Sequence, residues 1–297
     1  MSKRIIYIGT PHIIKTKDLQ LVLVNADTGE INIIPIEDIS VIELDNPQIT
    51  ITSYCLRELM DNKVVIIQCD FYHHPSGMMV PISASTLSTQ RTLAQSNMKS
   101  ELKSILWKSV IENKIRNQTQ VLKSINCQIE RMKKLLEGTE KADKTNREAQ
   151  AAKYYWKNLF EDFSRDPDGD YPNNLLNYGY SLIRAVFARE IVAAGLVPAL
   201  GIYHKNKYNS FCLADDLMEP YRQFVDLKVY KFCKSNPEEH SLILAKKHKK
   251  YLLEILTMEV EIEHQRKSII NAVQDSVMSF VKSIEQEKEQ LIYPIII

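Results

Sequence analysis

Residues 99–137 read KSELKSILWKSVIENKIRNQTQVLKSINCQIERMKKLLE. Apolar side chains recur along this stretch every three or four residues, from Leu102 to Leu136, and the positions between them are mostly charged or polar. This spacing places the apolar side chains on one face of a helix. The stretch therefore predicts a long amphipathic helix, which ends at Gly138 and the charged segment that follows it.

The helical period continues towards the end of the chain. Between the expected helices, residues 163–174 hold two prolines and a glycine and are expected to form a loop. We expect further helices over residues 145–163, 175–194, 219–234, 241–260 and 264–290.

The first eighty or so residues have a different pattern, in which short β-branched runs alternate with turn signals such as Asp27-Thr28-Gly29. No run is followed by a glycine-rich phosphate loop, which disfavours a nucleotide-binding α/β fold. We expect one short helix at 53–61 and strands at 4–8, 19–24, 31–35, 41–44, 49–52, 64–68 and 78–82. The predicted fold class is α+β: a small β-sandwich-like or meander domain (residues 1–84), a linker near 83–89, and a larger all-α domain (residues 85–297) that would carry the chemistry.

Bulk composition narrows the function classes. The formal net charge is +1, so any argument for nucleic-acid binding must rest on local basic residues. The five cysteines are scattered and form no CxxC pair, which favours a reducing cytoplasm over a disulfide framework or a zinc site. No apolar run is long enough to span a membrane, and the first residues lack the features of a signal peptide. We expect a cytoplasmic protein without a membrane partner.

Two segments carry isolated candidates for a functional site. Glu148 follows Thr145 by three residues, which is the spacing of a capping box, so the acid could simply cap its helix. Alternatively, its carboxylate faces a cleft. His204 ends the apolar stretch 195–202, where a lone histidine is either a packed, hydrogen-bonded residue or a metal ligand.

A third segment, 214–222, contains three acids in five residues: Asp215, Asp216 and Glu219. On a helix, Glu219 shares a face with both aspartates, and the repulsion between like charges would be relieved by Arg222 or by a bound cation. Alternatively, the acids favour the dipole of a helix that begins near Pro220.

Two carboxylates and one imidazole together form an oxygen-rich donor set, which suits Mg²⁺ or Mn²⁺ better than zinc. Such an ion supports phosphodiester hydrolysis and transesterification. The donor set Glu148, His204 and Glu219 therefore points to a metal-dependent enzyme acting on a nucleic acid.

Six motifs resemble those of the CRISPR-associated integrase and endonuclease of adaptation modules, most closely the variant of type II, single-effector systems. The similarity extends from the strand-rich start to about residue 235. The motifs are NREAQAA (146–152), FSRD (163–166), LNYGY (176–180), FARE (187–190), GIYH (201–204) and LADDLMEPYR (213–222).

The resemblance implies that Glu148, His204 and Glu219 are the catalytic metal ligands, with Asp216 as a further acid near the site. It implies cleavage of DNA and strand transfer that inserts short foreign DNA into a CRISPR array. It also implies a homodimer formed through the β domains, with two dimers bridged by a dimer of a small companion protein; the effector nuclease of the same system is a further candidate partner.

Basic residues in or near the motifs are the candidates for contacts with DNA phosphates: Arg147, Arg165, Arg189, Lys205 and Arg222. Two other functions remain open. One is a metal-dependent nuclease or junction resolvase with no role in integration, and the other is a non-catalytic DNA-binding scaffold whose acids cap helices.

Overall fold

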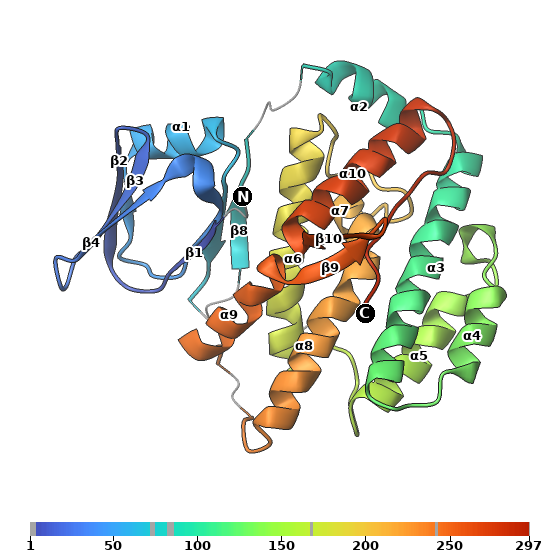
Figure 1. Cartoon of the computed structure of the whole chain (residues 1–297). Helices are drawn as coiled ribbons and strands as arrows, with labels where there is room; N and C mark the ends of the chain where they lie inside the picture. The colour runs from blue at the N-terminus through green and yellow to red at the C-terminus, as the bar shows by residue number, and fades with distance from the viewer. Residues whose placement is uncertain (1–3, 72–74, 82–85, 167–168, 241–242, 297) are drawn as a thin grey trace.

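The structure, a computed structural model, describes residues 4–71, 75–81, 86–166, 169–240 and 243–296. Strands occupy the N-terminal part of the chain, drawn in blue on the left of Figure 1, and helices make up most of the remainder. The α+β class predicted from the two periods is confirmed.

The N-terminal strands form two four-stranded sheets among the described residues. The first sheet runs in the order β1 (Arg4–Ile8), β5 (Ile39–Leu44), β7 (Val65–Cys69) and β8 (Pro75–Met79). The second runs in the order β4 (Ile31–Pro35), β3 (Gln20–Asn25), β2 (His12–Lys17) and β6 (Thr50–Ile51). A short 3-10 segment, η1 (Ile36–Asp38), precedes β5, and helix α1 (Ser53–Asp61) lies between β6 and β7.

Both sheets and α1 contribute to one apolar core, in which Ile14, Leu21, Ile42 and Leu59 are buried. However, β1, β5 and β7 pair in parallel, and only β8 joins them antiparallel. Parallel neighbours need crossover connections, unlike the hairpins of a meander. The N-terminal β region is thus confirmed, whereas the predicted sandwich is not.

Strand β2 was missed by the sequence pattern. It forms a two-residue hairpin with β3, in which Asp18 and Leu19 have φ values of 50° and 58°. Such turns usually contain glycine or asparagine at these positions, so this one carries no obvious signal. Leu19, predicted to begin the strand, is instead an exposed turn residue.

The helical region is built around α6 (Asn173–Ala193), whose side chains are buried along most of its length. It packs against α7 (Cys212–Met218), α8 (Arg222–Ser235), α9 (Lys246–Leu253) and α10 (Ile269–Glu285), and it also contacts β7 and β8. The other helices are α2 (Ser88–Ser96), α3 (Ser100–Ser124), α4 (Glu130–Glu137) and α5 (Arg147–Leu159), with short 3-10 segments η2 (Lys141–Asp143), η3 (Glu219–Tyr221) and η4 (Glu254–Thr257). No helix among these described residues is long and apolar enough to cross a bilayer.

The long helix predicted over 99–137 is two helices, because the chain reverses between α3 and α4. Asn126 has a φ of 61° at this bend, a left-handed conformation that asparagine tolerates better than most residues. In Figure 1, α4 lies beside the end of α3.

The helical region is also not all-α. A hairpin of β9 (Glu259–Ile262) and β10 (Gln265–Ser268) occupies the start of the helix predicted over 264–290, and it turns at Glu263 and His264, which have φ values of 49° and 62°. Residues 241–242, where another predicted helix begins, lie outside the described residues, and α9 begins at Lys246. The predicted linker falls partly outside the described residues as well, and Ser88 already belongs to α2.

A buried polar cluster joins the first sheet to the helices. Lys249 of α9 is fully buried, and its Nζ lies 2.6 Å from Asp45 Oδ2 and 3.9 Å from Glu43 Oε1. The hydroxyl of Tyr178 in α6 donates to Glu43 at 2.6 Å, and that of Tyr7 in β1 donates to Asp45 at 2.5 Å. Burying two carboxylates is tolerable because each has a cation and a hydroxyl donor nearby.

We expect Lys249→Met to destabilise the protein by about 3 kcal/mol, because it removes the cation shared by two buried carboxylates. Urea unfolding followed by circular dichroism measures the change. The control is Lys250→Met, which alters an exposed neighbour on the same helix and should stay within about 0.5 kcal/mol of the wild type. Equal stability of the two variants would contradict a structural role for the cluster.

Candidate functional site

Three segments that are distant in the sequence meet at one ammonium group. Lys114 of α3 places Nζ 2.6 Å from Glu148 Oε1, near the start of α5, and 2.6 Å from Glu219 Oε2 in η3. Burial alone lowers the pKa of a lysine, but the negative charges of Glu219 and Glu148 outweigh it and raise the pKa of Lys114. Lys114 therefore stays protonated and carries its positive charge between the two carboxylates.

Glu148 reaches this position because another acid caps its helix. The carboxylate of Asp143 accepts hydrogen bonds from the backbone N–H groups of Arg147 (2.7 Å) and Glu148 (3.0 Å). Thr145 bonds the carbonyl of Gly138 instead. The predicted capping box of Thr145 and Glu148 is thus wrong, and the Glu148 side chain is left to face Lys114.

Glu219 is buried between two cations. Arg222 Nε donates to its Oε1 at 2.9 Å, and Lys114 approaches its Oε2. Burial opposes ionisation, but Arg222 and Lys114 together lower the pKa of Glu219 to about 2. Pro220 lies in the first turn of η3, as predicted, where a missing N–H does no harm.

His204 is held by Asp216. Its Nδ1 lies 2.5 Å from Asp216 Oδ1, and since the carboxylate can only accept, Nδ1 carries the proton, which leaves the lone pair on Nε2 when the ring is neutral. This hydrogen bond raises the pKa of His204 against the opposing effect of burial. Asp216 is fully buried and also accepts from the backbone N–H groups of Ile202 and Tyr203 at 2.6 Å and 2.9 Å.

The loop that carries His204 depends on Gly201 and Trp107. A Cβ at Gly201 would lie 2.7 Å from Asp216 Oδ2, so a side chain there would push the carboxylate away. Trp107, buried in α3, stacks on the ring of Tyr203 with centroids 4.4 Å apart and meets the His204 ring edge-on at 5.8 Å. The imidazole is therefore oriented from two sides.

The three acids of the segment 214–222 have separate partners. Asp215 accepts from Arg184 (2.6 Å to Oδ1) and from Asn209 (2.6 Å to Oδ2), which makes it a structural acid. Asp216 accepts hydrogen bonds from the ring of His204 and from backbone N–H groups. Because both of its oxygens already accept, the structure favours a role in orienting His204 over direct ligation of a metal. Glu219 alone of these three faces Lys114.

The donor chemistry fits a divalent cation. Glu148 and Glu219 already share one cation, whose nitrogen lies 2.6 Å from an oxygen of each carboxylate. The carboxylate behind His204 is the usual arrangement behind a metal-bound histidine. In the part of the chain that the structure describes, no three His, Cys, Asp or Glu side chains yet converge closely enough to hold a metal.

A polar cleft of about 310 Å³ adjoins these residues. Lys114 and Glu219 form one side of it, and Trp156, Arg165 and Arg222 form the rest of the rim. The cleft also reaches Asp226, where burial raises the carboxyl pKa to about 7 although the hydroxyls of Tyr180 and Tyr155 bond to it. The cleft is lined by the cationic side chains of Lys114, Arg165 and Arg222 and by the acids Glu219 and Asp226, so the cationic side chains outnumber the anionic ones.

The predicted DNA-contact residues fall into different environments. Arg165 and Arg222 line the cleft, Lys205 is exposed beside His204, and Arg147 is half-buried against Gly138. Arg189 is 6% exposed and bonds Glu190 and the carbonyl of Ser40, so its prediction as a phosphate contact is corrected: it helps to join α6 to the first sheet.

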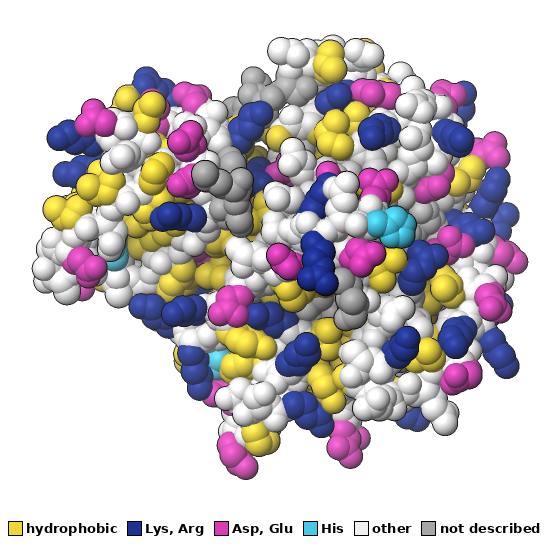
Figure 2. Space-filling view, in the orientation of Figure 1, with side chains coloured by type: hydrophobic (Ala, Val, Ile, Leu, Met, Phe, Trp, Pro, Cys, Tyr) yellow, Lys and Arg dark blue, Asp and Glu magenta, His cyan; other side chains and the backbone are white. Residues whose placement is uncertain are grey.

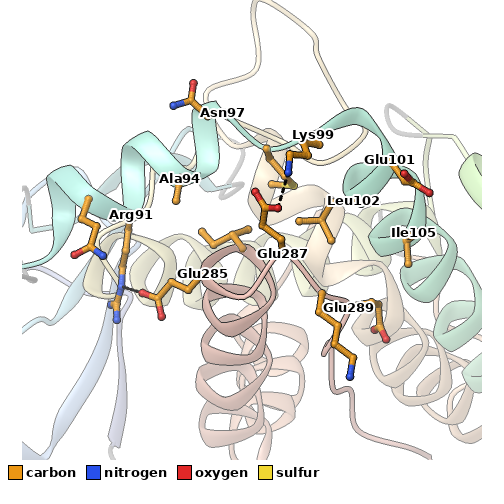
Figure 3. A pocket seen from close by; sticks show the side chains of 14 residues that line it. Arg91, Ala94, Asn97, Lys99, Glu101, Leu102, Ile105, Glu285, Glu287 and Glu289 are labelled. Carbon is orange, nitrogen blue, oxygen red and sulfur yellow. Dashed lines mark hydrogen bonds and ion pairs between the residues drawn. The ribbon is translucent and has the colours of Figure 1, made fainter.

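Neither the charge distribution nor a more voluminous pocket elsewhere marks the site. Lys and Arg side chains are interspersed with Asp and Glu on the face shown in Figure 2, as the net charge of +1 leads one to expect. A larger cavity of about 750 Å³ lies between α2, the start of α3 and the end of α10. Figure 3 shows that its rim charges pair with each other, Arg91 with Glu285 and Lys99 with Glu287, and no nucleophile or metal-ligand set lines it.

Sequence reasoning missed Lys114 and Trp107. Both lie on the apolar face of α3: Lys114 follows Val110 by four residues, Ile111 by three and Trp107 by seven. A lysine in the middle of an apolar stripe needs buried acidic partners, so the position of Lys114 in the sequence could have indicated a buried ion pair.

Comparisons with known proteins agree with the motifs. The family model described as CRISPR associated protein Cas1 matches residues 6–256. A CRISPR-associated endonuclease Cas1 of Neisseria meningitidis serogroup C (strain 8013) is 33% identical over 270 residues, covering 90% of this chain and 88% of the relative. Another, from Saccharolobus solfataricus, is 29% identical over 201 residues and covers 61% of this chain and 62% of its own length.

Solved structures show the same fold at low identity. A casposase bound to integration product has a TM-score of 0.81 with 21% identity, over 98% of this chain and 92% of that chain. A Cas1 protein from Thermotoga maritima has a TM-score of 0.76 with 17% identity, over 97% and 99%. The matched family model and the Neisseria relative carry the assignment: the chain belongs to the CRISPR associated protein Cas1 family.

Proposed function

We propose that this protein is a divalent-metal-dependent DNA endonuclease and integrase, which inserts short foreign DNA into a CRISPR array. The observation that carries the proposal is the meeting of Glu148 and Glu219 at one ammonium group, with His204 near enough for the charge of Glu219 to act on its ring. Relatives named as endonucleases and a fold neighbour described as bound to an integration product support it.

In this proposal Glu148, Glu219 and His204 Nε2 hold Mg²⁺ or Mn²⁺. When bound, the ion would lower the pKa of a water or a 3′-hydroxyl and neutralise charge on the attacked phosphate. Asp216 keeps the imidazole in the tautomer that ligates, and Trp107 limits its rotation. Arg222 keeps Glu219 ionised, so the carboxylate is ready as a ligand without loss of a proton.

The adjoining cleft suits a DNA phosphate next to the metal ligands. Arg165 and Arg222 present guanidinium groups there, and both stack over the Tyr180 ring, at 5.3 Å and 4.7 Å from its centroid. Trp156 forms an apolar wall against which a base could stack. The cleft thus combines phosphate recognition and base stacking within reach of Glu219.

Assembly is proposed from the second sheet. Its strands and their turn expose the apolar side chains Ile13, Leu19, Ile31 and Ile33, which is consistent with a homodimer formed through the β domains. A fold neighbour described as a Cas6-RT-Cas1--Cas2 complex, of which this chain covers 36%, is an assembly with a second adaptation protein. We propose an equivalent companion here, with DNA fragment and repeat as substrates in the cytoplasm, and leave the type of system as a prediction.

Of the two other functions, the scaffold is the weaker. It required Glu148 to act as a helix cap, yet Asp143 has that role. The nuclease without integration uses the same site and differs in its nucleophile, water in place of a 3′-hydroxyl, so it is separated by experiment.

Replacing any proposed ligand should abolish strand transfer. Glu148→Ala, His204→Ala and Glu219→Ala are each expected to reduce integration at least about a hundredfold, because each removes a donor from the metal. A gel assay with labelled DNA and Mn²⁺ measures this, and circular dichroism checks the fold. Glu259→Ala, which changes an exposed acid on β9, is the control. A Glu219→Ala variant as active as wild type would disprove the assignment.

Blocking the 3′ end of the donor DNA separates integrase from nuclease. With a 3′-hydroxyl fragment we expect a joined product, and with a 3′-dideoxy fragment we expect none, since the nucleophile is missing. Cleavage of a branched substrate should continue in both cases. Joining that persists with the blocked fragment would contradict transesterification by the 3′-hydroxyl.

Arg165→Ala should weaken DNA binding by loss of one phosphate contact. The slope of log affinity against log salt concentration is expected to fall by roughly 0.9, measured by fluorescence anisotropy on duplex DNA. Arg266→Ala in β10, an exposed arginine on the hairpin, is the matched control and should leave the slope unchanged. An unchanged slope for Arg165→Ala would show that Arg165 makes no contact with a DNA phosphate.

A further inference from the structure

Lys114 differs from the structural lysine Lys249 because it meets its two acids at the edge of a cleft. Its side chain is 12% exposed and emerges from the apolar face of α3, and its ammonium contacts both proposed ligand carboxylates at 2.6 Å. Elsewhere in the molecule, exposed lysines pair with a single acid at the surface, as Lys108 does with Glu112. The ammonium of Lys114 thus lies between the two carboxylates that are proposed to bind the metal.

Charge balance makes the lysine and a metal alternatives. Lys114 and Arg222 carry two positive charges, and Glu148 and Glu219 carry two negative charges, so the cluster is neutral as it stands. A divalent ion on the same oxygens would leave two uncompensated positive charges in a largely buried space, which is costly. Binding of the ion therefore requires the ammonium to leave the carboxylates.

Distances lead to the same conclusion. Two oxygens that each lie 2.6 Å from one nitrogen can be separated by up to twice that length. Two oxygens bound to one Mg²⁺ at about 2.1 Å each can be at most about 4.2 Å apart. The ammonium therefore tolerates a wider pair of carboxylates than Mg²⁺ does, and no three-residue ligand cluster is present among the described residues.

The displaced ammonium has a place to go. Lys114 lines the 310 Å³ cleft together with Glu219, Gln118, Arg165 and Arg222. A lysine has a long, flexible stem, so its head can move into the cleft without a shift of α3. There it would contact the DNA phosphate that Arg165 and Arg222 are proposed to bind.

We propose that Lys114 is a resident cation of the site: it bridges Glu148 and Glu219 while no metal is bound, yields them to the divalent ion, and then contacts a DNA phosphate in the cleft. This inference rests on the proposed function and deepens it. It assigns Lys114 a direct part in both metal loading and substrate binding.

Metal affinity tests the first part of the proposal, in which Lys114 and the divalent ion compete for the same carboxylates. Titration calorimetry with Mn²⁺ on the full chain compares wild type with Lys114→Met, which keeps the stem and removes the charge. If the lysine occupies the carboxylates about nine-tenths of the time, its removal tightens Mn²⁺ binding about tenfold. Lys108→Met, on the same helix but half-exposed, should bind Mn²⁺ like wild type.

Thermal melting gives a second readout that does not depend on activity. Without metal, Lys114→Met should melt below wild type because the two acids repel. Saturating Mn²⁺ should raise its melting temperature by more than it raises that of wild type, since the ion replaces the lost cation. Lys114→Gln, which keeps a hydrogen-bond donor, serves if the methionine variant does not fold, and its affinity should lie between the two.

Salt dependence tests the second half. In Mn²⁺, Lys114→Met should lose roughly 0.9 from the slope of log DNA affinity against log salt, whereas without metal its slope should match wild type. Equal or weaker Mn²⁺ binding by both Lys114 variants, with a wild type that binds metal, would overturn the inference and leave the proposed function standing. A wild type that binds no Mn²⁺ would overturn the metal site itself, and the inference with it.

Discussion

The ion contacts of Lys114 are the constraint on which the arrangement of the site depends. They bring α3, α5 and η3 to one point, although these elements come from well-separated parts of the chain. Glu148 and Glu219 would repel each other at this separation without a cation between them. Placing that cation on the long helix α3 makes the acid pair compatible with a folded protein.

A second buried lysine shows what a purely structural version looks like. Lys249 also faces two acids, Glu43 and Asp45, but tyrosine hydroxyls bond those carboxylates as well, and the group is sealed between the sheet and the helices. Lys114 has no such enclosure, because it lines an open polar cleft. The same residue types therefore lie in a sealed cluster in one place and beside an open cleft in the other, and access to solvent is the difference between them.

Much of the fold follows from local sequence, and the exceptions have a shared cause. Strands β1 and β4 and helix α1 begin and end at the predicted residues because β-branched runs or helical spacing meet clear turn signals. The errors at residues 18–19, 126 and 263–264 are all turns in which ordinary side chains adopt positive φ. Tertiary packing enforces those conformations, and a reading of local propensity cannot see it.

The candidate site shows the same difference between what local sequence predicts and what tertiary contacts decide, here within five residues of chain. Asp215, Asp216 and Glu219 look equivalent in sequence, yet they face Arg184, His204 and Lys114 respectively. Helical spacing identifies which acids share a face but not which partner the neighbouring element supplies. For Asp216 the deciding contacts are the backbone N–H groups of residues 202 and 203, and backbone donors have no signature in the sequence. These two N–H groups occupy Asp216 Oδ2 and the His204 ring occupies Oδ1, whereas Glu219 Oε2 meets the ammonium of Lys114.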